Sequence, residues 1–450
     1  MSEYTLSIIL ALLVVVISYD NLLVSAIGLG WSTFLVIIYF ERLGKALPIL
    51  ELMLVMAALQ WIVGAKIAYW QESDHFKYYM YVDENAYMSL VVPGVICFSL
   101  GVLFFKRRVS FIEVNQRLER YVLSYPRSPY ILIVIGLFAT YTSGSIPLAF
   151  RFIFYLLQSF QFAGVALLIF LPDKAAKWYW FLVVMGLLVV SSVVRGLFHD
   201  LILWSILLYS FICLKFRISF LVKLVTIAVA VISVSVLQEI KSEYRQLIYG
   251  KSNQERVGIF YDLITQRVAE PAVLDDNTEG EELEALNVRL NQGWIISAIL
   301  YNMPRYQNFI GGESITEAIG ASLLPRFIYQ DKKQAGGREN FRVFTGLPIR
   351  DDTSMGVSIL GEAYANYGMS GAYLFMFIWG AFLALGFSFL LKRALNYPLL
   401  VAMLPLIFLQ VIKAETELVV VLNHFVKSTV LVLSFLWAAQ NLLGWKFQSN

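Results

Sequence analysis

The chain has 450 residues, of which 59% are hydrophobic and 15% are charged. A soluble domain is roughly half apolar and about a quarter charged, so most of this chain has lipid as its solvent, which excludes a soluble enzyme, a disordered protein and a secreted disulfide scaffold. With 35 Lys and Arg residues against 32 Asp and Glu residues, the net charge of +3 argues against nucleic acid as a main partner.

Apolar runs of roughly 15–22 residues recur along the chain, about the length that crosses a bilayer as a helix. We therefore predict an all-α polytopic membrane protein with about twelve transmembrane helices. The predicted spans lie near residues 5–18, 22–40, 48–70, 89–105, 130–146, 152–171, 178–194, 198–214, 218–237, 369–391, 398–412 and 427–445. No basic region precedes the first run and further spans follow at once, so we do not expect a cleavable signal peptide.

Basic residues mark alternate connections between the predicted spans. They are Arg42 and Lys45; Lys106, Arg107, Arg108, Arg117, Arg120 and Arg127; Lys174 and Lys177; Lys215 and Arg217; and Lys392 and Arg393. The intervening connection at 71–88 is acidic instead. Because Lys and Arg stay on the cytoplasmic side in short loops, this alternation predicts that both termini are cytoplasmic.

One connection is far longer than the others. On this topology residues 238–368 lie outside the cytoplasm, between the ninth and tenth predicted spans. The predicted organisation is therefore nine spans in 1–237, one large and mainly helical outer loop in 238–368, and three spans in 369–450. The loop contains enough aromatic residues to pack into a small folded cap. Its mostly acidic stretch at 275–284 is instead typical of a segment exposed to water.

The predicted outer loop favours arginine over lysine, with nine arginines against four lysines. A guanidinium group is a planar fork of donors that grips phosphate or carboxylate in a bidentate way. The bias therefore indicates an anionic, membrane-borne ligand such as a lipid diphosphate; the alternative is that the arginines pair with the loop's own acids or with lipid headgroups. The nine are Arg245, Arg256, Arg267, Arg289, Arg305, Arg326, Arg338, Arg342 and Arg350.

Arg195 stands where the seventh predicted span ends, and His199 and Asp200 follow before the eighth. A single charge near the interface can snorkel to water. Three polar groups in a tight turn between helices, however, more often face a polar cavity. Arg245 lies two helical turns beyond the outer end of the ninth span, where it is able to point into the same cavity.

The three histidines, His75, His199 and His424, all fall on the predicted outer side. Any of them is able to carry a proton near neutral pH, although an ordinary interfacial role is the simpler interpretation. A dense polar cluster also occupies the connection before the last span and the start of that span. Lipid does not tolerate such a cluster, so we expect it to line the same aqueous site. It comprises Glu415, Glu417, Asn423, His424 and Lys427.

The motifs of soluble chemistry are absent from the sequence: there is no Walker A loop, dinucleotide fingerprint, GxSxG elbow or HExxH. In the Asp pairs at 275–276 and 351–352 the two residues are adjacent. Their side chains project to different sides, so the two residues of a pair are poor joint ligands for one metal ion. The two cysteines, Cys97 and Cys213, lie in apolar stretches without CxxC or zinc spacing. We therefore predict no bound metal and no cofactor.

Six short motifs occur in order along the chain. They are Tyr78–Glu84 (YYMYVDE), Arg195-Gly196, Ser242–Arg245 (SEYR), Leu324–Arg326 (LPR), Thr353–Gly356 (TSMG) and Gly361–Gly368 (GEAYANYG). With these motifs, about twelve spans and one large outer loop late in the chain, the sequence resembles the integral-membrane polymerases of bacterial surface polysaccharide. These are the Wzy-type O-antigen or oligosaccharide repeat-unit polymerases.

The resemblance implies a metal-independent glycosyltransferase in the bacterial inner membrane. It would take a growing glycan from one undecaprenyl diphosphate carrier and join it to a new lipid-linked repeat unit at the outer face. The anomeric configuration would be either inverted or retained. Undecaprenyl-diphosphate-linked glycans would be the substrates, and a chain-length regulator and a flippase would be the partners.

The resemblance also implies roles for particular residues. Arg195, Arg245 and Arg326 would stabilise the charge on the departing diphosphate. Either Glu362 or His424 would act as a base toward the acceptor hydroxyl. Further contacts with the substrates are predicted at Tyr244, His199, Arg338, Arg342 and Lys427.

Three alternatives stay open. The related O-antigen ligases share the architecture but carry a functional histidine in the large outer loop, and residues 238–368 contain none; this departure favours a polymerase, although His424 or His199 is available as a substitute. A flippase or other transporter of lipid-linked oligosaccharides would place polar residues at mid-membrane depth in several spans, whereas here Glu51 and Lys66 are the main residues away from the outer edge. A non-catalytic assembly scaffold is the third alternative.

Overall fold

The computed structural model describes residues 5–71, 79–107, 109–172, 175–269, 287, 290–324, 337–350 and 353–447. Throughout these ranges the regular secondary structure consists of helices, and no β-strand occurs. The predicted all-α class is therefore confirmed. In lipid, a helix satisfies every backbone N–H and C=O group within its own segment, which explains why long apolar runs adopt this structure.

Nine helical segments in the described ranges are long and apolar enough to cross a membrane. They are α2 (Leu23–Arg42); Ile49–Trp70, built from α3 (Ile49–Ala58), the π-helical turn η1 (Leu59–Val63) and α4 (Gly64–Trp70); α5 (Glu84–Phe105); Phe150–Leu168, built from α8 (Leu148–Gln158) and α9 (Phe160–Leu168); α10 (Ala175–Arg195); α11 (His199–Phe216); α12 (Phe220–Leu247); α18 (Ile359–Arg393); and α20 (Leu418–Asn441). A tenth is present if α6 (Phe111–Ser124) and α7 (Ser128–Thr142), which meet at an 86° bend, form one span. The chain is thus a multi-pass membrane protein.

Three of the twelve predicted spans coincide with helices that are shorter than a typical crossing, one of them α7 with 15 residues. The other two, α1 (Thr5–Ile17) and α19 (Leu400–Ile412), have 13 residues each. At about 1.5 Å per residue such a helix is about 20 Å long, against a hydrocarbon core of about 30 Å. The count of twelve therefore stays a prediction, and nine or ten spans are shown in the described residues.

The chain divides into two compact units. The first comprises residues 1–42, 48–114 and 290–448, and the second comprises 43–47, 115–289 and 449–450. The predicted outer loop contributes to both, because residues 238–289 belong to the second unit and residues 290–368 to the first.

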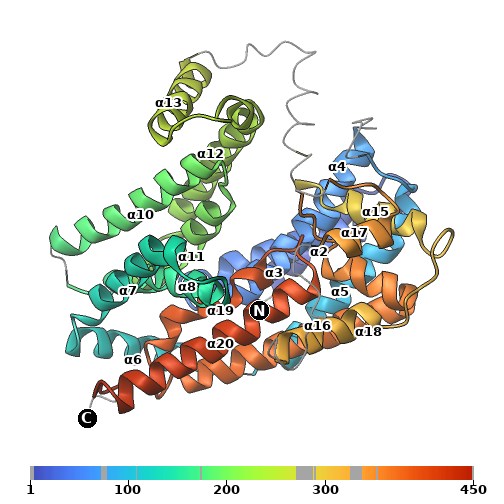
Figure 1. The fold of residues 1–450 in the computed structure, drawn as a ribbon. Helices are drawn as coiled ribbons and strands as arrows, with labels where there is room; N and C mark the ends of the chain where they lie inside the picture. The colour runs from blue at the N-terminus through green and yellow to red at the C-terminus, as the bar shows by residue number, and fades with distance from the viewer. Residues whose placement is uncertain are drawn as a thin grey trace. The chain divides into compact units, whose positions relative to one another are not determined.

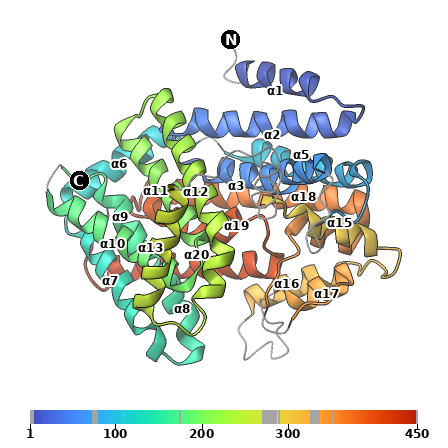
Figure 2. The same cartoon turned by 90° about the horizontal axis from the view of Figure 1, so that it is seen from above.

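In the first unit, α5 and α18 pack side by side at very close range (Figures 1 and 2). A Cβ atom at Gly101 would lie 2.1 Å from the Phe377 carbonyl oxygen, and one at Gly380 would lie 2.3 Å from the Phe98 carbonyl oxygen. Small residues of this kind let two membrane helices bring their backbones together. Helix α1 lies along α2 at the edge of this unit (Figure 2), and α18 has a non-helical backbone at Gly368 (φ 68°, ψ −169°).

Three helices of this unit lie in the stretch predicted as outer loop: α15 (Gly293–Asn302), α16 (Glu313–Leu323) and α17 (Arg338–Thr345). Helix α15 is apolar and almost completely buried. Its Asn302 amide donates to the carbonyl oxygens of Val343 and Phe344 in α17 at 3.2 and 3.0 Å. Residues 293–302 and 338–345 thus pack together within the first unit.

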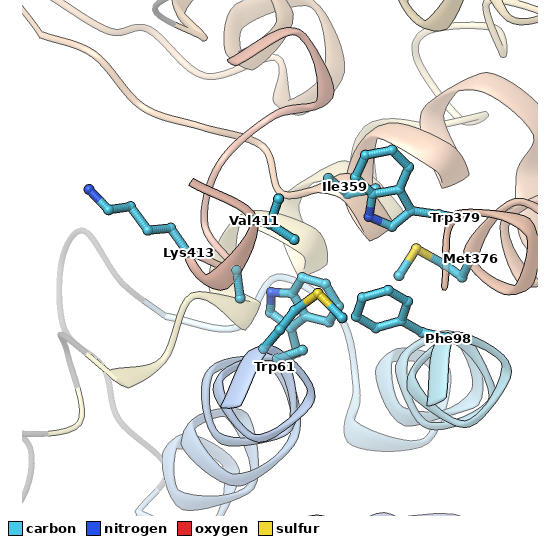
Figure 3. Close-up of a pocket in the computed structure, with 10 residues that line it drawn as sticks. Trp61, Phe98, Ile359, Met376, Trp379, Val411 and Lys413 are labelled. Carbon is cyan, nitrogen blue, oxygen red and sulfur yellow. The ribbon is translucent and has the colours of Figure 1, made fainter. Parts of the chain in front are cut away.

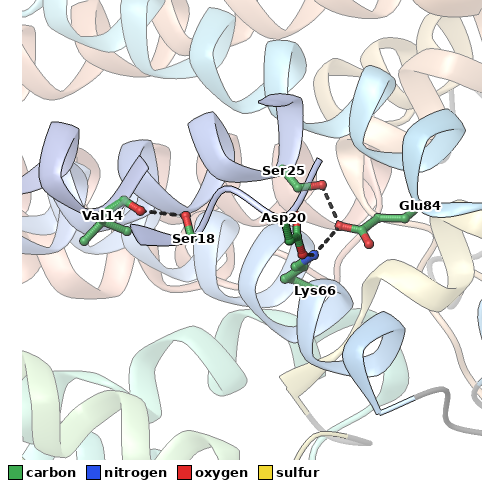
Figure 4. Close-up of polar contacts among 6 residues, drawn as sticks. All are labelled: Val14, Ser18, Asp20, Ser25, Lys66 and Glu84. Carbon is green, nitrogen blue, oxygen red and sulfur yellow. Dashed lines mark hydrogen bonds and ion pairs between the residues drawn. The ribbon is translucent and has the colours of Figure 1, made fainter. Parts of the chain in front are cut away.

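Lys66 in α4 lies between two carboxylates of the first unit (Figure 4). Its Nζ atom donates to Oδ2 of Asp20 at 2.6 Å and to Oε1 of Glu84 at 2.8 Å. The Ser25 hydroxyl donates to the same Glu84 oxygen at 2.6 Å. The Lys66 side chain is only 14% exposed. This cluster, which we call the Lys66 cluster (Asp20, Ser25, Lys66 and Glu84), ties the α1–α2 turn to α4 and to the first turn of α5.

Acid is expected to loosen the Lys66 cluster. The Lys66 ammonium donates a hydrogen bond that holds the pKa of Asp20 below its ordinary value. The stabilisation from ionised Asp20 is therefore complete above its unfolded pKa of about 4, and it is lost as the pH falls through the lower folded value. Asp20→Asn should flatten the decline in thermal stability below about pH 4, measured on the purified chain in detergent. An equal decline in Asp20→Asn and wild type would contradict this role.

In the second unit, α7 and α9 pack closely, and α10 contacts α9, α11 and α13 (Asn253–Ala269). A Cβ atom at Gly136 of α7 would lie 2.3 Å from the Gln161 backbone nitrogen of α9. A small core joins the ends of α10 and α12 to the start of α11. Its buried members are Val193, Phe198, Tyr244 and Ile248.

Candidate functional site

Helix α10 ends at Arg195 in a well-defined C-terminal cap. The next residue, Gly196, has a positive φ of 63°, which glycine adopts without the steric cost that a Cβ atom brings. The Gly196 N–H donates to the Val193 carbonyl and the Leu197 N–H to the Ser192 carbonyl, each at 3.0 Å. These two bonds form a Schellman motif, which stops the helix and turns the chain into α11 at His199.

Two further arginines bind the carbonyl groups around this cap. Nε of Arg245, near the end of α12, donates to the Gly196 carbonyl at 3.0 Å. Nη1 of Arg256, from α13, donates to the Val194 carbonyl at 2.9 Å. Arg195 itself is exposed at the last residue of α10. We call Arg195, Arg245 and Arg256 the arginine cluster; Arg245 contacts Gly196, the residue that follows Arg195.

The arginine cluster concentrates positive charge at one place. A helix C-terminus carries partial negative charge, which favours cations placed beside it. Arg267 lies on the same helix as Arg256 but forms an ion pair with Glu239 at 2.5 Å. The cluster therefore has the electrostatic character of a site for a polyanionic ligand.

Tyr244 packs beside the arginine cluster. Its side chain is completely buried, and its hydroxyl lies 2.7 Å from the Val193 carbonyl oxygen, to which it donates. Its ring packs against Phe198 and Phe260, with centroids at 6.5 and 5.3 Å. Tyr244 is predicted from the sequence to contact the substrate, but this placement gives it a positioning role beneath Arg245.

Arg256 is the member of the cluster that sequence reasoning did not single out. It follows a capping box in which the Ser252 N–H and hydroxyl donate to Glu255 at 2.8 and 2.7 Å. These donors hold the pKa of Glu255 below its ordinary value. The S-x-x-E pattern in the sequence predicts the start of α13 and thereby the placement of Arg256 in its first turn.

Gly196→Ala is expected to destabilise the cap by about 1–2 kcal/mol, because an L-residue with a Cβ atom pays this cost in the left-handed region. The new methyl group would lie in van der Waals contact with Arg245, 3.4 Å from its Cγ atom. Gly186→Ala in the same helix is the matched control, since its Cβ atom would meet open space and alanine favours a helix. Thermal unfolding in detergent measures both; equal stability of the two variants would contradict the expectation.

In the first unit, Glu362 anchors a buried polar network. Its side chain is 1% exposed. Oε1 accepts from the Ser314 hydroxyl of α16 at 2.8 Å, and Oε2 accepts from the Leu418 backbone N–H of α20 at 2.8 Å. The Asn366 amide donates to the same Ser314 oxygen at 2.8 Å. One carboxylate thus ties α18 to α16 and satisfies an otherwise orphaned donor at the start of α20.

Glu417 and His424, which belong to the predicted polar cluster near α20, are buried too. Glu417, the residue before α20, is 2% exposed and accepts from the Asn340 amide of α17 at 2.9 Å. His424 is also 2% exposed, and its Nε2 lies 2.7 Å from the Leu406 carbonyl oxygen. Because a carbonyl oxygen only accepts, this contact makes Nε2 the protonated nitrogen. In this arrangement both side chains hold helices together.

The remaining predicted site residues are placed as follows. His199 is the first residue of α11 and is half-buried, and Lys427 is half-buried in α20. Arg338 and Arg342 are exposed in α17, where Nη2 of Arg342 donates to the Ile349 carbonyl at 2.6 Å. Arg326, like His75, lies outside the described residues.

A small apolar cleft is present in the first unit (Figure 3). Rings and thioethers from α5, α18 and η1 line it, and the Lys413 side chain points away from them. The Trp61 indole N–H is buried and has no hydrogen-bond partner among the described residues. The lining suits hydrocarbon, and none of the predicted site residues belongs to it. The lining residues named in Figure 3 are Trp61, Phe98, Ile359, Met376, Trp379, Val411 and Lys413.

Residues 66–389 match the model of a family described as a domain of unknown function (DUF8712). The matched segment covers more than two thirds of the chain. It contains the whole arginine cluster and Glu362, whereas His424 and Lys427 lie beyond it. No curated protein and no solved structure matches the chain.

Proposed function

The chain belongs to this DUF8712 family, and we propose that it is a glycosyltransferase that polymerises undecaprenyl-diphosphate-linked oligosaccharide repeat units. It acts at the outer face of the bacterial inner membrane. In this proposal the chain crosses the membrane about twelve times, with α1 and α19 as short spans around which the bilayer thins. Both termini are cytoplasmic, and the stretch 238–368 faces outward.

The arginine cluster is the observation that carries the proposal. A diphosphate is a compact polyanion, and planar guanidinium groups bind its oxygens with paired N–H donors. Arg245 and Arg256 bind carbonyl oxygens of the turn that ends α10 at Arg195, and the apolar core around Tyr244 packs beside this turn. Such preorganised donors cost little reorganisation when charge develops on the leaving group.

The reaction that fits this site is substitution at an anomeric carbon. The acceptor hydroxyl oxygen forms the new bond to that carbon, while the bond from the carbon to the diphosphate oxygen breaks. The electron pair of the broken bond leaves with undecaprenyl diphosphate, and the hydroxyl proton goes to a base or to water. The arginine cluster stabilises the departing charge, which is greatest in the transition state and product.

The sequence offers Glu362 and His424 as candidate bases, but their contacts favour a positioning role for both residues. A base must come within hydrogen-bond reach of the acceptor hydroxyl. Glu362 uses both of its oxygens on partners inside the protein, and His424 is similarly buried. The proposal therefore rests on stabilisation of the leaving group, and both residues act mainly as positioning groups.

Purified protein mixed with lipid-linked repeat units tests the proposal. We expect a ladder of glycans that grows by one repeat at a time, and we expect it to persist when a chelator is added. A flippase would move the substrate across a vesicle membrane without making bonds, so it would give no ladder. Transfer to a lipid acceptor of another kind, without growth in repeats, would indicate a ligase instead.

A further inference from the structure

Four tyrosines and one arginine form a continuous aromatic surface in the first unit. Tyr79 and Tyr81 precede α5 and stack with ring centroids 4.2 Å apart. Tyr81 lies 6.2 Å from Tyr301 at the end of α15, and Tyr301 lies 5.7 Å from Tyr306. The Arg305 guanidinium lies 5.5 and 5.3 Å from the ring centroids of Tyr301 and Tyr306. We call these five residues the tyrosine platform.

The platform keeps its rings accessible although their segments are anchored. Tyr79, Tyr301 and Tyr306 are 39%, 40% and 62% exposed. The Tyr81 backbone N–H donates to the Ser297 hydroxyl at 3.1 Å, which ties the segment before α5 to α15. Large aromatic faces that are held rigidly in contact with solvent mark a binding surface more often than an accident of folding.

The chemistry of the platform suits a carbohydrate. A pyranose ring presents a face of C–H bonds that packs flat on an aromatic ring, while its hydroxyls bond to phenol oxygens and to guanidinium groups. Successive ring centroids lie between 4.2 and 6.2 Å apart, so the four rings form one contiguous aromatic patch. Arg305 adds donors that are able to bond a hydroxyl or the carboxylate of an acidic sugar.

The arrangement of the rings distinguishes this surface from an aromatic belt at a membrane interface. Belt residues are amphipathic rings distributed around the helix ends at headgroup level. Here two separate segments bring the rings against one another in a row, and the hydroxyls of Tyr301 and Tyr306 lie 3.5 Å apart. A cation also packs on two of the rings.

We propose that the tyrosine platform is an oligosaccharide-binding subsite that holds the glycan of a lipid-linked substrate by stacking. The identity of the glycan rests on the proposed function, but the stacking itself does not. The platform would keep a chain of sugars in register while the reaction occurs, which lowers the entropic cost of bringing two substrates together.

Binding without reaction tests this subsite. The full chain in lipid nanodiscs is mixed with oligosaccharides released by mild acid from the host's own surface polysaccharide, and saturation-transfer NMR and calorimetry report contact and affinity. Loss of one stacked ring in Tyr301→Ala should weaken binding about tenfold. Tyr301→Phe, which keeps the ring, should retain most of the affinity. Tyr141→Ala removes a tyrosine that is 74% exposed elsewhere and should bind like wild type.

The possible results separate this proposal from its rivals. If the wild-type chain does not bind the oligosaccharides, or if Tyr301→Ala and Tyr301→Phe both bind unchanged, the proposal is overturned. Strong quenching of the platform tyrosines by headgroup-labelled lipids, with no oligosaccharide contact, would identify an interface belt instead. The released oligosaccharides carry no diphosphate and form no new bond in this experiment, so a failure of the polymerisation reaction leaves this test unaffected.

Discussion

Replacing Arg195 or Arg245 with alanine is expected to abolish long surface polymer while leaving the amount of protein in the membrane unchanged. Each change removes a guanidinium donor from the departing diphosphate. Loss of one preorganised donor of this kind typically lowers turnover about a hundredfold to a thousandfold. The length distribution of the surface polysaccharide on a gel, with immunoblotting of membranes, measures both quantities.

Matched variants separate charge from geometry. Arg195→Lys keeps the positive charge but loses the bidentate fork, so it should restore only part of the chain length. Arg120→Ala removes an exposed arginine of α6 in the same unit and should leave the polymer unchanged. Arg245 also binds the Gly196 carbonyl, so its alanine variant needs the abundance control most. Normal long chains in Arg195→Ala or in Arg245→Ala would remove that residue from the proposed site.

The largest effect on stability is expected from Glu362→Ala. The change removes the acceptor of two buried donors, the Ser314 hydroxyl and the Leu418 N–H, and leaves both without it. Removal of one member of a buried charged network costs about 3 kcal/mol or more. Thermal and denaturant unfolding of the purified protein should show this loss.

Two further variants distinguish positioning from catalysis at this residue. Ser314→Ala removes one donor and keeps the carboxylate, so its cost should be smaller. Glu362→Gln keeps the shape but turns one oxygen into a donor, and it should lose stability together with activity. A Glu362→Gln protein that unfolds like wild type but makes no polymer would contradict the positioning role and restore Glu362 as the base.

Local sequence patterns predicted the helices well because in lipid the backbone N–H and C=O groups must be hydrogen-bonded within the protein, and a helix does this within one segment. Each of the twelve predicted spans coincides with a helix of the structure, although α1, α7 and α19 are short. Helix α6 lies in a stretch that the sequence analysis assigns to a basic connection between two spans. Its buried residues Val114, Leu118 and Tyr121 recur at helical spacing, so the information was present in the sequence. Helix α6 ends before Pro126, and the chain bends by 86° into α7. Both features follow because a proline disfavours the helical conformation of the residue before it.

The site was predictable only where its residues are close in sequence. Arg195, His199 and Asp200 lie in one turn between two predicted spans. Arg245 lies two helical turns beyond the end of the ninth predicted span, so its position is predicted from the sequence. The contact of Arg256 with the Val194 carbonyl depends instead on how α13 folds back toward α10. The bond from Leu418 to Glu362 joins residues that are 56 positions apart. Such non-local contacts are decided by tertiary packing, which periodicity and composition do not encode.

The release of free undecaprenyl diphosphate tests the central claim most directly. Purified protein is mixed with lipid-linked repeat units under conditions of limited turnover, and new glycosidic bonds and free carrier are counted in the same sample. The account predicts one carrier released for each bond formed, with both lost together in Arg195→Ala. Movement of intact substrate without carrier release, or equal release by wild type and Arg195→Ala, would contradict it.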